Sequence, residues 1–573
     1  MAATKNRDNF KLRTRVILGA VLIVALLLVV RLYFLQIIHG NEYRDEASDQ
    51  YVSTSGGFYD RGSIFFVDKN KLQVRGATIK TGYIIALKPV EITDPEPVYA
   101  VLKDYVSIDR DTFMARANKA GDPYEEVATR VSDEDAAKIK EADLDGVLLI
   151  QQHWRYYPSG SLAAQTLGFV AYDGSSLDGR YGIERYFEDV LKRGASNLYV
   201  NFFAELFTNI RDVVFVPVNK REGNVITTLE PEVQLHLERT LAEVQSTWHS
   251  RFSAGVVIDP QTGEIKAMAV SPTFDLNDFE DAKTSQFANP IVENVFEMGS
   301  IMKPLTVAAG LDSGAITVDS TYNDTGSIKL NGATISNYDG RARGVVSVQE
   351  ILSQSLNVGA SYVVQKMGKE EFRRYMYRFG MNEETGIDLP NEAANLTENL
   401  NSPRDVEYAT ASFGQGVAVT PINMVRALSI LPDGYAEQPH VVSAIQSTNG
   451  LTHDVDYSDV REQILKPATA EKITRMLVKV VDEALAHGDD KMEHYSIAAK
   501  TGTAQIASPN GGYYDDRYLH SFFGYFPAYD AKYLIFLMTV EPVGAPYASQ
   551  TLTKPFMDMT HFLINYYDIP PDR

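Results

Sequence analysis

The stretch Gly299-Ser300-Ile301-Met302-Lys303-Pro304 marks the start of a helix in the C-terminal half of the chain. Proline is tolerated only in the first turn of a helix, so this helix begins close to Ser300. Residues three apart on a helix share a face, which places Lys303 one turn from the Ser300 hydroxyl. A serine hydroxyl is a weak nucleophile until a base takes its proton, and a lysine with a lowered pKa can be that base. The stretch is therefore compatible with a nucleophile and its base, although the same spacing taken alone is more often a surface serine beside a solvated lysine.

The segments on either side of this helix predict an α+β fold. The expected elements are a helix over 233–247, strands over 253–258 and 264–270, helices over 304–311 and 348–367, strands over 497–506, 521–527 and 533–540, and a last helix over 555–567. They follow from apolar residues at helical spacing and from short apolar runs bounded by turn residues. Strands at both ends of a region, with helices between them, are typical of an α+β domain.

A second motif, Ser355-Leu356-Asn357, follows in the next predicted helical region. Its hydroxyl can relay a proton between Lys303 and a leaving amine. Its amide can hydrogen-bond a substrate peptide. Taken alone the motif carries little information, because serine and asparagine are common at helix boundaries.

A third motif, Lys500-Thr501-Gly502-Thr503, lies on a predicted strand. Gly502 has no Cβ, so another backbone or a substrate can approach closely there. The Lys500 cation disfavours the charged form of a neighbouring lysine. The two threonine hydroxyls can bind a substrate carboxylate.

The three motifs occur in the order that penicillin-binding proteins and class A β-lactamases share. The chain resembles class B penicillin-binding proteins over nearly its whole length, most closely the division-specific FtsI type. Further stretches that carry the resemblance are Arg61-Gly62-Ser63-Ile64, Arg155-Tyr156-Tyr157-Pro158-Ser159-Gly160, Gly182-Ile183-Glu184, Phe413-Gly414-Gln415-Gly416 and Phe523-Gly524-Tyr525-Phe526-Pro527-Ala528. The chain departs from the family pattern at Met298, at Leu356 and at Glu230, where proline, serine and aspartate are usual.

This resemblance implies a membrane protein in four parts. They are a cytoplasmic tail over 1–15, a transmembrane anchor over 16–38, an elongated mixed α/β pedestal of the dimerisation type over 39–222, and a penicillin-binding transpeptidase domain over 223–573. The transpeptidase domain is expected to contain an antiparallel sheet flanked by helices. No cofactor and no metal are implied.

The implied activity is a D,D-transpeptidase that cross-links peptidoglycan stem pentapeptides in septal wall synthesis and is acylated by β-lactams. In that reading Ser300 forms the acyl-enzyme with Lys303 as base. The other expected catalytic residues are Ser355, Asn357 and Lys500, and those expected to bind substrate are Thr501, Gly502 and Thr503. Partners implied in the same way are an FtsW-type glycan polymerase and other divisome proteins.

Three other functions remain open from the sequence. An elongation-specific class B transpeptidase would use the same residues. A D,D-carboxypeptidase or β-lactamase would use water as the acceptor, but the anchor and pedestal disfavour it. A non-enzymatic divisome scaffold is disfavoured by the intact set of Ser300, Lys303, Ser355, Asn357 and Lys500.

The N-terminus predicts an anchor in the bacterial inner membrane. Basic residues within 5–15 precede an apolar run over 16–30, and after Arg31 a second run continues over 32–38. Together the runs can cross a bilayer core of roughly 30 Å. The basic flank is expected to stay in the cytoplasm, which places the catalytic domain outside it. A cleaved signal peptide is the alternative, but no small-residue cleavage site follows closely.

The composition excludes several classes of function. The chain of 573 residues holds 54 basic and 75 acidic residues, a net charge of −21, which disfavours binding to nucleic acid. It has no cysteine, which rules out thiol catalysis, thiolate metal sites and disulfides. The run from His487 to His494 is expected to be a solvated charged segment rather than a metal site.

Overall fold

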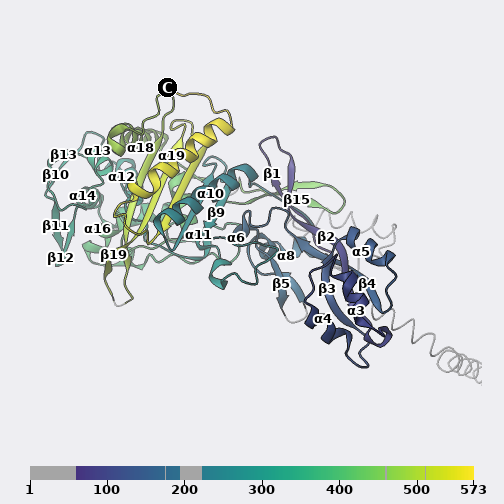
Figure 1. Cartoon of the computed structure of the whole chain (residues 1–573). Coiled ribbons are helices and arrows are strands. Elements are labelled where there is room, and N and C mark those ends of the chain that lie inside the picture. Colours follow the sequence, from purple (N-terminus) through teal and green to yellow (C-terminus); the bar gives the residue numbers. More distant parts are fainter. Residues whose placement is uncertain (1–59, 174–175, 194–221, 459–460, 510) are drawn as a thin grey trace, which may run out of the picture. The chain divides into compact units, whose positions relative to one another are not determined.

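The computed structural model describes residues 60–173, 176–193, 222–458, 461–509 and 511–573 (Figure 1). This part of the chain forms two compact units, a smaller one over Lys80–Trp154 and a larger one made of Arg61–Ile79 and Arg155–Arg573. The expected tail, anchor and first pedestal residues, 1–59, lie outside the described residues. Among the helices that are described, none has the length and apolar character needed to span a bilayer.

The smaller unit packs helices against a small set of strands. Its elements are the last part of β2 (Gln73–Leu87), α3 (Pro95–Leu102), α4 (Arg110–Ala117), β3 (Glu125–Val131), α5 (Asp133–Glu141) and β4 (Val147–Tyr156). β2 pairs with β4 and, in antiparallel register, with β3. The core of this unit includes Leu87, Phe113 and Ile139, all buried. The Ser132 side chain accepts a hydrogen bond from the Asp135 N–H and so fixes the start of α5.

Distant segments of the larger unit meet in one small sheet. Across it lie β16 (Thr452–Asp454), β15 (Val442–Ser447), β7 (Gly223–Thr227), β1 (Ile64–Val67) and the first part of β2. β1 runs parallel to β7, with Ile64 opposite Val225, and β7 runs antiparallel to β15. A strand from the N-terminal part of the chain therefore belongs to the same compact unit as the C-terminal region.

A buried ion-pair cluster ties the start of β1 to a later segment of the larger unit. Glu184 is fully buried and accepts hydrogen bonds from Arg61 Nε and Arg155 Nε, each at 2.6 Å. The Tyr157 hydroxyl adds a third at 3.2 Å, and Arg155 Nη1 donates to the Gly62 carbonyl at 2.7 Å. Burial raises the pKa of Glu184, but the two guanidinium groups outweigh burial and hold that pKa below its usual 4.5. Three stretches far apart in the sequence thus form one polar core.

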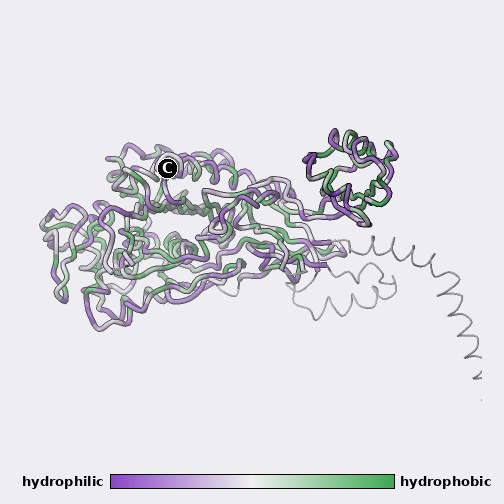
Figure 2. Tube along the Cα trace, turned by 60° about the horizontal axis from the view of Figure 1, so that its bottom comes forward, coloured by the Kyte–Doolittle hydropathy of each residue, from purple (hydrophilic) through white to green (hydrophobic). Residues whose placement is uncertain are grey.

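The central sheet of the larger unit is antiparallel and buried on both faces. Its strands lie in the order β18 (Ala498–Ala507), β19 (Tyr513–Phe526), β20 (Tyr533–Val540), β8 (Phe252–Ile258) and β9 (Ile265–Ser271). Successive residues point to opposite faces, so Val257 and Leu537 join one apolar cluster while Val256 and Phe536 join another. Figure 2 shows hydrophobic stretches inside this unit and hydrophilic turns at its periphery.

Two long helices cover one face of this sheet. α10 (Pro231–Trp248) and α19 (Ala548–Tyr566) contact each other and the sheet (Figure 1). Glu230 accepts a hydrogen bond from the Val233 N–H at 2.7 Å and caps α10, so the glutamate that departs from the family pattern still closes the helix start. On the other face, α18 (Pro467–Lys479) and α12 (Lys303–Asp312) pack into the larger cluster.

Two expected helices differ from the structure. The helix expected over 348–367 is broken into α13 (Gln349–Ser353) and α14 (Asn357–Met367), because Ser355 between them has a φ of 55° that a helix cannot contain. The last helix begins at Ala548, not near 555, so Pro555 lies inside it. Its apolar face, including the fully buried Phe556 and Leu563, packs into the core and offsets the backbone hydrogen bond that proline removes.

Replacing Glu184 by glutamine should lower the free energy of unfolding by about 3–5 kcal/mol, because two buried guanidinium groups would then face a neutral amide. Denaturant unfolding of the full chain in detergent measures this change. The control is Glu471→Gln, which breaks an exposed pair with Arg475 and should cost less than about 1 kcal/mol. If Glu184→Gln cost no more than the control, the cluster would not be what holds β1 in the larger unit.

Candidate active site

The sequence around Ser300 forms a tight entry into α12. Gly299–Met302 is a turn of 3-10 helix, and α12 follows directly with Pro304 in its first turn, where the missing N–H removes no helical hydrogen bond. The predicted helix start at Ser300 is confirmed. The side chains of Ser300 and Lys303 lie one turn apart, with Lys303 Nζ 2.8 Å from Ser300 Oγ.

Ser355 reaches the same lysine from the break between α13 and α14. Lys303 Nζ lies 2.7 Å from the Ser355 carbonyl oxygen and 3.0 Å from Ser355 Oγ. The left-handed backbone at Ser355 turns both of these atoms toward the lysine. Leu356, the residue that departs from the family pattern, is fully buried and anchors the turn in the core.

The surroundings of Lys303 favour a neutral amine. Its side chain is fully buried, and this burial together with the nearby Lys500 ammonium holds the pKa of Lys303 well below its usual 10.5. A neutral amine has two N–H groups and one lone pair. The Ser355 carbonyl can only accept, so it takes one N–H, and the lone pair can then face the proton of one of the two hydroxyls. The arrangement is that of a base set against Ser300 and Ser355.

The third motif lies on β18, the edge strand of the central sheet. A Cβ on Gly299 would come within 2.7 Å of the Thr503 carbonyl oxygen, so that carbonyl points away from β19 toward the Ser300 turn. The N–H and C=O of one residue in an antiparallel strand point to the same side. The Thr503 N–H therefore also faces the open edge, on the side where Ser300 lies.

Gly502 allows the close approach that the sequence predicted. A Cβ at this position would lie 2.4 Å from Ser521 Oγ and 2.9 Å from the Met298 carbonyl oxygen. The Ser521 hydroxyl donates to that carbonyl at 3.0 Å and so joins the sheet to the turn before Ser300. Ser521 has no counterpart among the predicted site residues, and a serine inside an apolar strand run was the only signal for it.

Lys500 lies at the buried end of the same motif. It is 3% exposed, and its Nζ donates to the Thr501 carbonyl at 2.9 Å. Burial lowers the pKa of Lys500 to about 7. The structure thus brings together two lysines whose pKa values are both lowered.

Asn357 is held by a neighbouring segment. Its Nδ2 donates to the Ser336 carbonyl at 2.9 Å, and the next residue, Val358, donates its N–H to Asn337 Oδ1 at 3.2 Å. The amide therefore positions the start of α14 against β12 (Ala333–Ser336). A contact from this amide to a substrate peptide stays a prediction.

Glu297 is a neighbour of the site that the sequence did not single out. Its Oε1 accepts from the Gly416 N–H at 3.0 Å and from the Tyr513 hydroxyl at 3.1 Å, and burial raises its pKa above the usual 4.5. Gly414, in the same segment, lies with its backbone against the Ser300 turn. A Cβ at this position would lie 2.3 Å from the Gly299 carbonyl oxygen, so only glycine allows this approach. The Phe413-to-Gly416 stretch is thus a support for the Ser300 turn.

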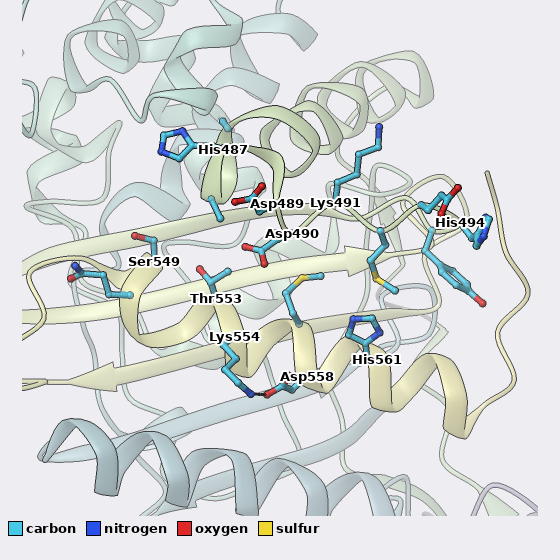
Figure 3. A pocket seen from close by; sticks show the side chains of 17 residues that line it. His487, Asp489, Asp490, Lys491, His494, Ser549, Thr553, Lys554, Asp558 and His561 are labelled. Carbon is cyan, nitrogen blue, oxygen red and sulfur yellow. Dashed lines mark hydrogen bonds and ion pairs between the residues drawn. The ribbon is translucent and has the colours of Figure 1, made fainter.

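One pocket of the larger unit lies away from these residues. It has a volume of about 880 Å³ and lies between α19 and the segment over 484–495 (Figure 3). Figure 3 shows His487 and His494 at opposite ends of it, with Asp489 and Asp490 between them. Within the described residues no three histidine or carboxylate side chains lie close enough together to hold a metal ion.

Comparison with known families decides the class of the protein. Residues 253–559 match the family described as penicillin binding protein transpeptidase domain, and residues 60–206 match the penicillin-binding protein dimerisation domain. The chain is a class B penicillin-binding protein. As a member of this class it is a peptidoglycan D,D-transpeptidase.

Relatives of this penicillin-binding protein align with most of its length. Stage V sporulation protein D of Bacillus subtilis is 27% identical over 93% of this chain and 82% of its own length. Peptidoglycan D,D-transpeptidase FtsI of Buchnera aphidicola is 24% identical over 96% and 94%. A crystal structure of penicillin binding protein 3 from Mycobacterium tuberculosis, complexed with aztreonam, has a TM-score of 0.67 at 24% identity and covers 90% of this chain and 98% of its own. That likeness shows the shared fold.

The pKa shifts of the two lysines predict a bell-shaped pH profile for acylation by a penicillin. Lys303 must be neutral to take a proton, so the rate should rise with pH through its lowered pKa. In its expected role of binding a carboxylate Lys500 must be charged, so the rate should fall above pH of about 7. Lys500→Arg keeps its charge at every pH and should lose only the alkaline limb. The second-order acylation rate constant across this range is the measurement, and an unchanged alkaline limb in Lys500→Arg would assign that limb to another group.

Proposed function

We propose that this transpeptidase cross-links septal peptidoglycan during division, through an acyl-enzyme on Ser300, and that β-lactams acylate the same residue. The observation that carries the assignment of the nucleophile is the position of Lys303, whose Nζ lies within hydrogen-bond distance of both Ser300 Oγ and Ser355 Oγ. A base placed between two hydroxyls can accept the proton of one and return it through the other.

The proposed first half-reaction uses these three side chains. Ser300 Oγ attacks the carbonyl carbon of the penultimate D-alanine, and its proton passes to neutral Lys303. The oxyanion lies between the N–H groups of Ser300 and Thr503, each such donor being worth roughly 3–4 kcal/mol. The carbon–nitrogen bond then breaks, and the proton returns from Lys303 through Ser355 to the leaving D-alanine.

The second half-reaction completes the cross-link. An amine of a neighbouring stem peptide attacks the acyl carbon and passes a proton to Lys303. The ester bond to Ser300 Oγ then breaks, and Lys303 returns the proton to that oxygen, which restores the free serine. Lys500, Thr501 and Thr503 hold the carboxylate of the donor peptide in the first step. A buried cation with two hydroxyls beside it on an edge strand supports this assignment.

A four-part organisation accompanies this activity in the proposal. The tail occupies 1–15, the inner-membrane anchor 16–38, the pedestal 39–222 and the transpeptidase domain 223–573, with the catalytic domain outside the cytoplasm. Matches of the dimerisation and transpeptidase families in this order support it. The proposed partners are an FtsW-type glycan polymerase and other divisome proteins.

Division is the favoured process because relatives named FtsI align with nearly the whole chain. A second candidate is a role in sporulation, which the likeness to stage V sporulation protein D supports. Depletion of the protein in its host separates the two. Filamentous cells support division, whereas normal division with failed spore formation supports the second candidate.

Lys303→Arg should slow acylation of Ser300 by a fluorescent penicillin at least 100-fold, about as much as Lys303→Ala, because arginine does not deprotonate in a protein. Labelling of the full chain in detergent measures the rate, and Ser300→Ala, which should not label at all, is the control. A rate within tenfold of wild type in Lys303→Arg would make Lys303 a structural cation. Stoichiometric labelling of Ser300→Ala would reject the nucleophile.

Exchanging residues 16–38 for an unrelated single-span helix should preserve insertion and penicillin labelling but weaken co-purification with the polymerase and impair septal cross-linking. Arg31 lies within this span, and charges inside a membrane span usually face a partner or water. An unrelated helix would lack this contact with the partner. Complementation of a depleted strain and pull-down from its membranes are the measurements. Full complementation with unchanged co-purification would mean that any helix of this length serves and that Arg31 only reaches the headgroups.

A further inference from the structure

The first turn of α19 meets the third motif. The Ala548 N–H, at the start of α19, donates to Thr503 Oγ1 at 3.1 Å. A threonine hydroxyl has one proton to give. Because the Ala548 N–H occupies the oxygen as an acceptor, the hydroxyl proton of Thr503 remains to be donated to another group.

Behind this contact lies a second hydroxyl, that of Thr551. It donates to the Ala548 carbonyl at 3.2 Å, and its oxygen is also 2.9 Å from Nδ1 of His520. Since the single proton of Thr551 goes to the carbonyl, Nδ1 of His520 must carry a proton and donate it to Thr551. The donor and the acceptor are therefore determined for each hydrogen bond from His520 through Thr551 and Ala548 to Thr503.

His520 lies under the third motif. It is fully buried on β19, directly opposite Thr503 on β18. Burial lowers the pKa of His520 to about 4, so the imidazole is neutral at physiological pH. Its Nε2 is buried and meets no hydrogen-bond partner among the residues that the structure describes. Burying an unpaired nitrogen costs free energy that an apolar side chain would not cost. The contact that favours a histidine here is therefore the hydrogen bond from Nδ1 to Thr551.

We propose that His520 is a positioning residue for recognition of the substrate carboxylate. Through Thr551 it holds the first turn of α19, and Ala548 then orients the Thr503 hydroxyl as a donor toward the carboxylate of the donor peptide. The partial positive charge of the α19 N-terminus favours the same anion. This inference rests on the proposed function, which gives Thr503 that carboxylate.

The test compares two ligands and two matched pairs of variants. The ligands are benzylpenicillin and its methyl ester, which lacks the negative charge. His520→Leu removes the Nδ1 donor, whereas His520→Asn places an amide N–H near the same position. Thr551→Val and Thr551→Ser form a second pair that removes or keeps the hydroxyl. The full chain in detergent is acylated with each ligand, the second-order rate constant is followed by intact mass, and thermal unfolding reports on folding.

The expected result is a change in the ratio of the two rate constants. In His520→Leu and Thr551→Val the rate with benzylpenicillin should fall about tenfold, the loss expected when one hydrogen bond to a charged group is misplaced. The rate with the ester should stay within about twofold of wild type. His520→Asn and Thr551→Ser should keep the wild-type ratio.

Several outcomes would overturn the proposal. An unchanged ratio in folded His520→Leu would do so, as would an equal fall with both ligands, because a merely loosened site loses both rates together. If His520→Leu does not fold, the Thr551 pair decides, and failure of both removal variants to fold assigns the residues to the core instead. If benzylpenicillin does not acylate the wild-type protein, the proposed function is rejected. If it does, and the removal variants keep the wild-type ratio, only the role of His520 is rejected.

Discussion

The burial of two neighbouring lysine side chains is the constraint on which the rest of this active site depends. Lys303 is fully buried and Lys500 nearly so. Each loses hydration, and two ammonium groups at close quarters repel each other, so the site favours one neutral amine and one cation. The oxygens of Ser355 and Thr501 receive the N–H groups that would otherwise be unpaired. The left-handed backbone at Ser355, a strain of about 1–3 kcal/mol, is thus a condition for keeping a buried base.

Close backbone approach is the second requirement, because the three motifs come from elements that are far apart in the chain. Glycine allows it at Gly299, Gly414 and Gly502, where an added Cβ would meet a neighbouring oxygen at less than 3 Å. The Ser521 hydroxyl then bridges the Gly502 strand and the turn before Ser300. The nucleophile is held between the sheet and the segment over 413–416, and the Gly299 N–H donates to the Gly414 carbonyl at 3.1 Å.

The sequence predicted the elements better than their interruptions. Periodicity located α10, the α12 start and most strands of the central sheet within a few residues, since each has a regular apolar face. β19 is the exception, because it begins at Tyr513 and the expected strand began at 521. It missed the break at Ser355, which exists because a tertiary contact to Lys303 outweighs local helix preference. It also missed Glu297 and Ser521, because a buried carboxylate or a serine in a strand has no periodic signal. The pairing of Arg61 with Glu184 depends on contacts across more than a hundred residues, which only the fold reveals.

The parallel pairing of β1 with β7 has a consequence for the order in which the chain can fold. Ser63 and Asn224 are 161 residues apart, and Asn224 in turn meets Gln446 a further 222 residues along. β1 can pair with β2 as soon as that strand is made, but at ~5–20 residues per second of synthesis β7 follows roughly 8–30 s later. During that interval the edge of β1 that will face β7 has no partner strand, which is a period of exposure to aggregation. The larger unit of this enzyme therefore closes late, and its folding depends on protection of the open edge of the β1–β2 hairpin.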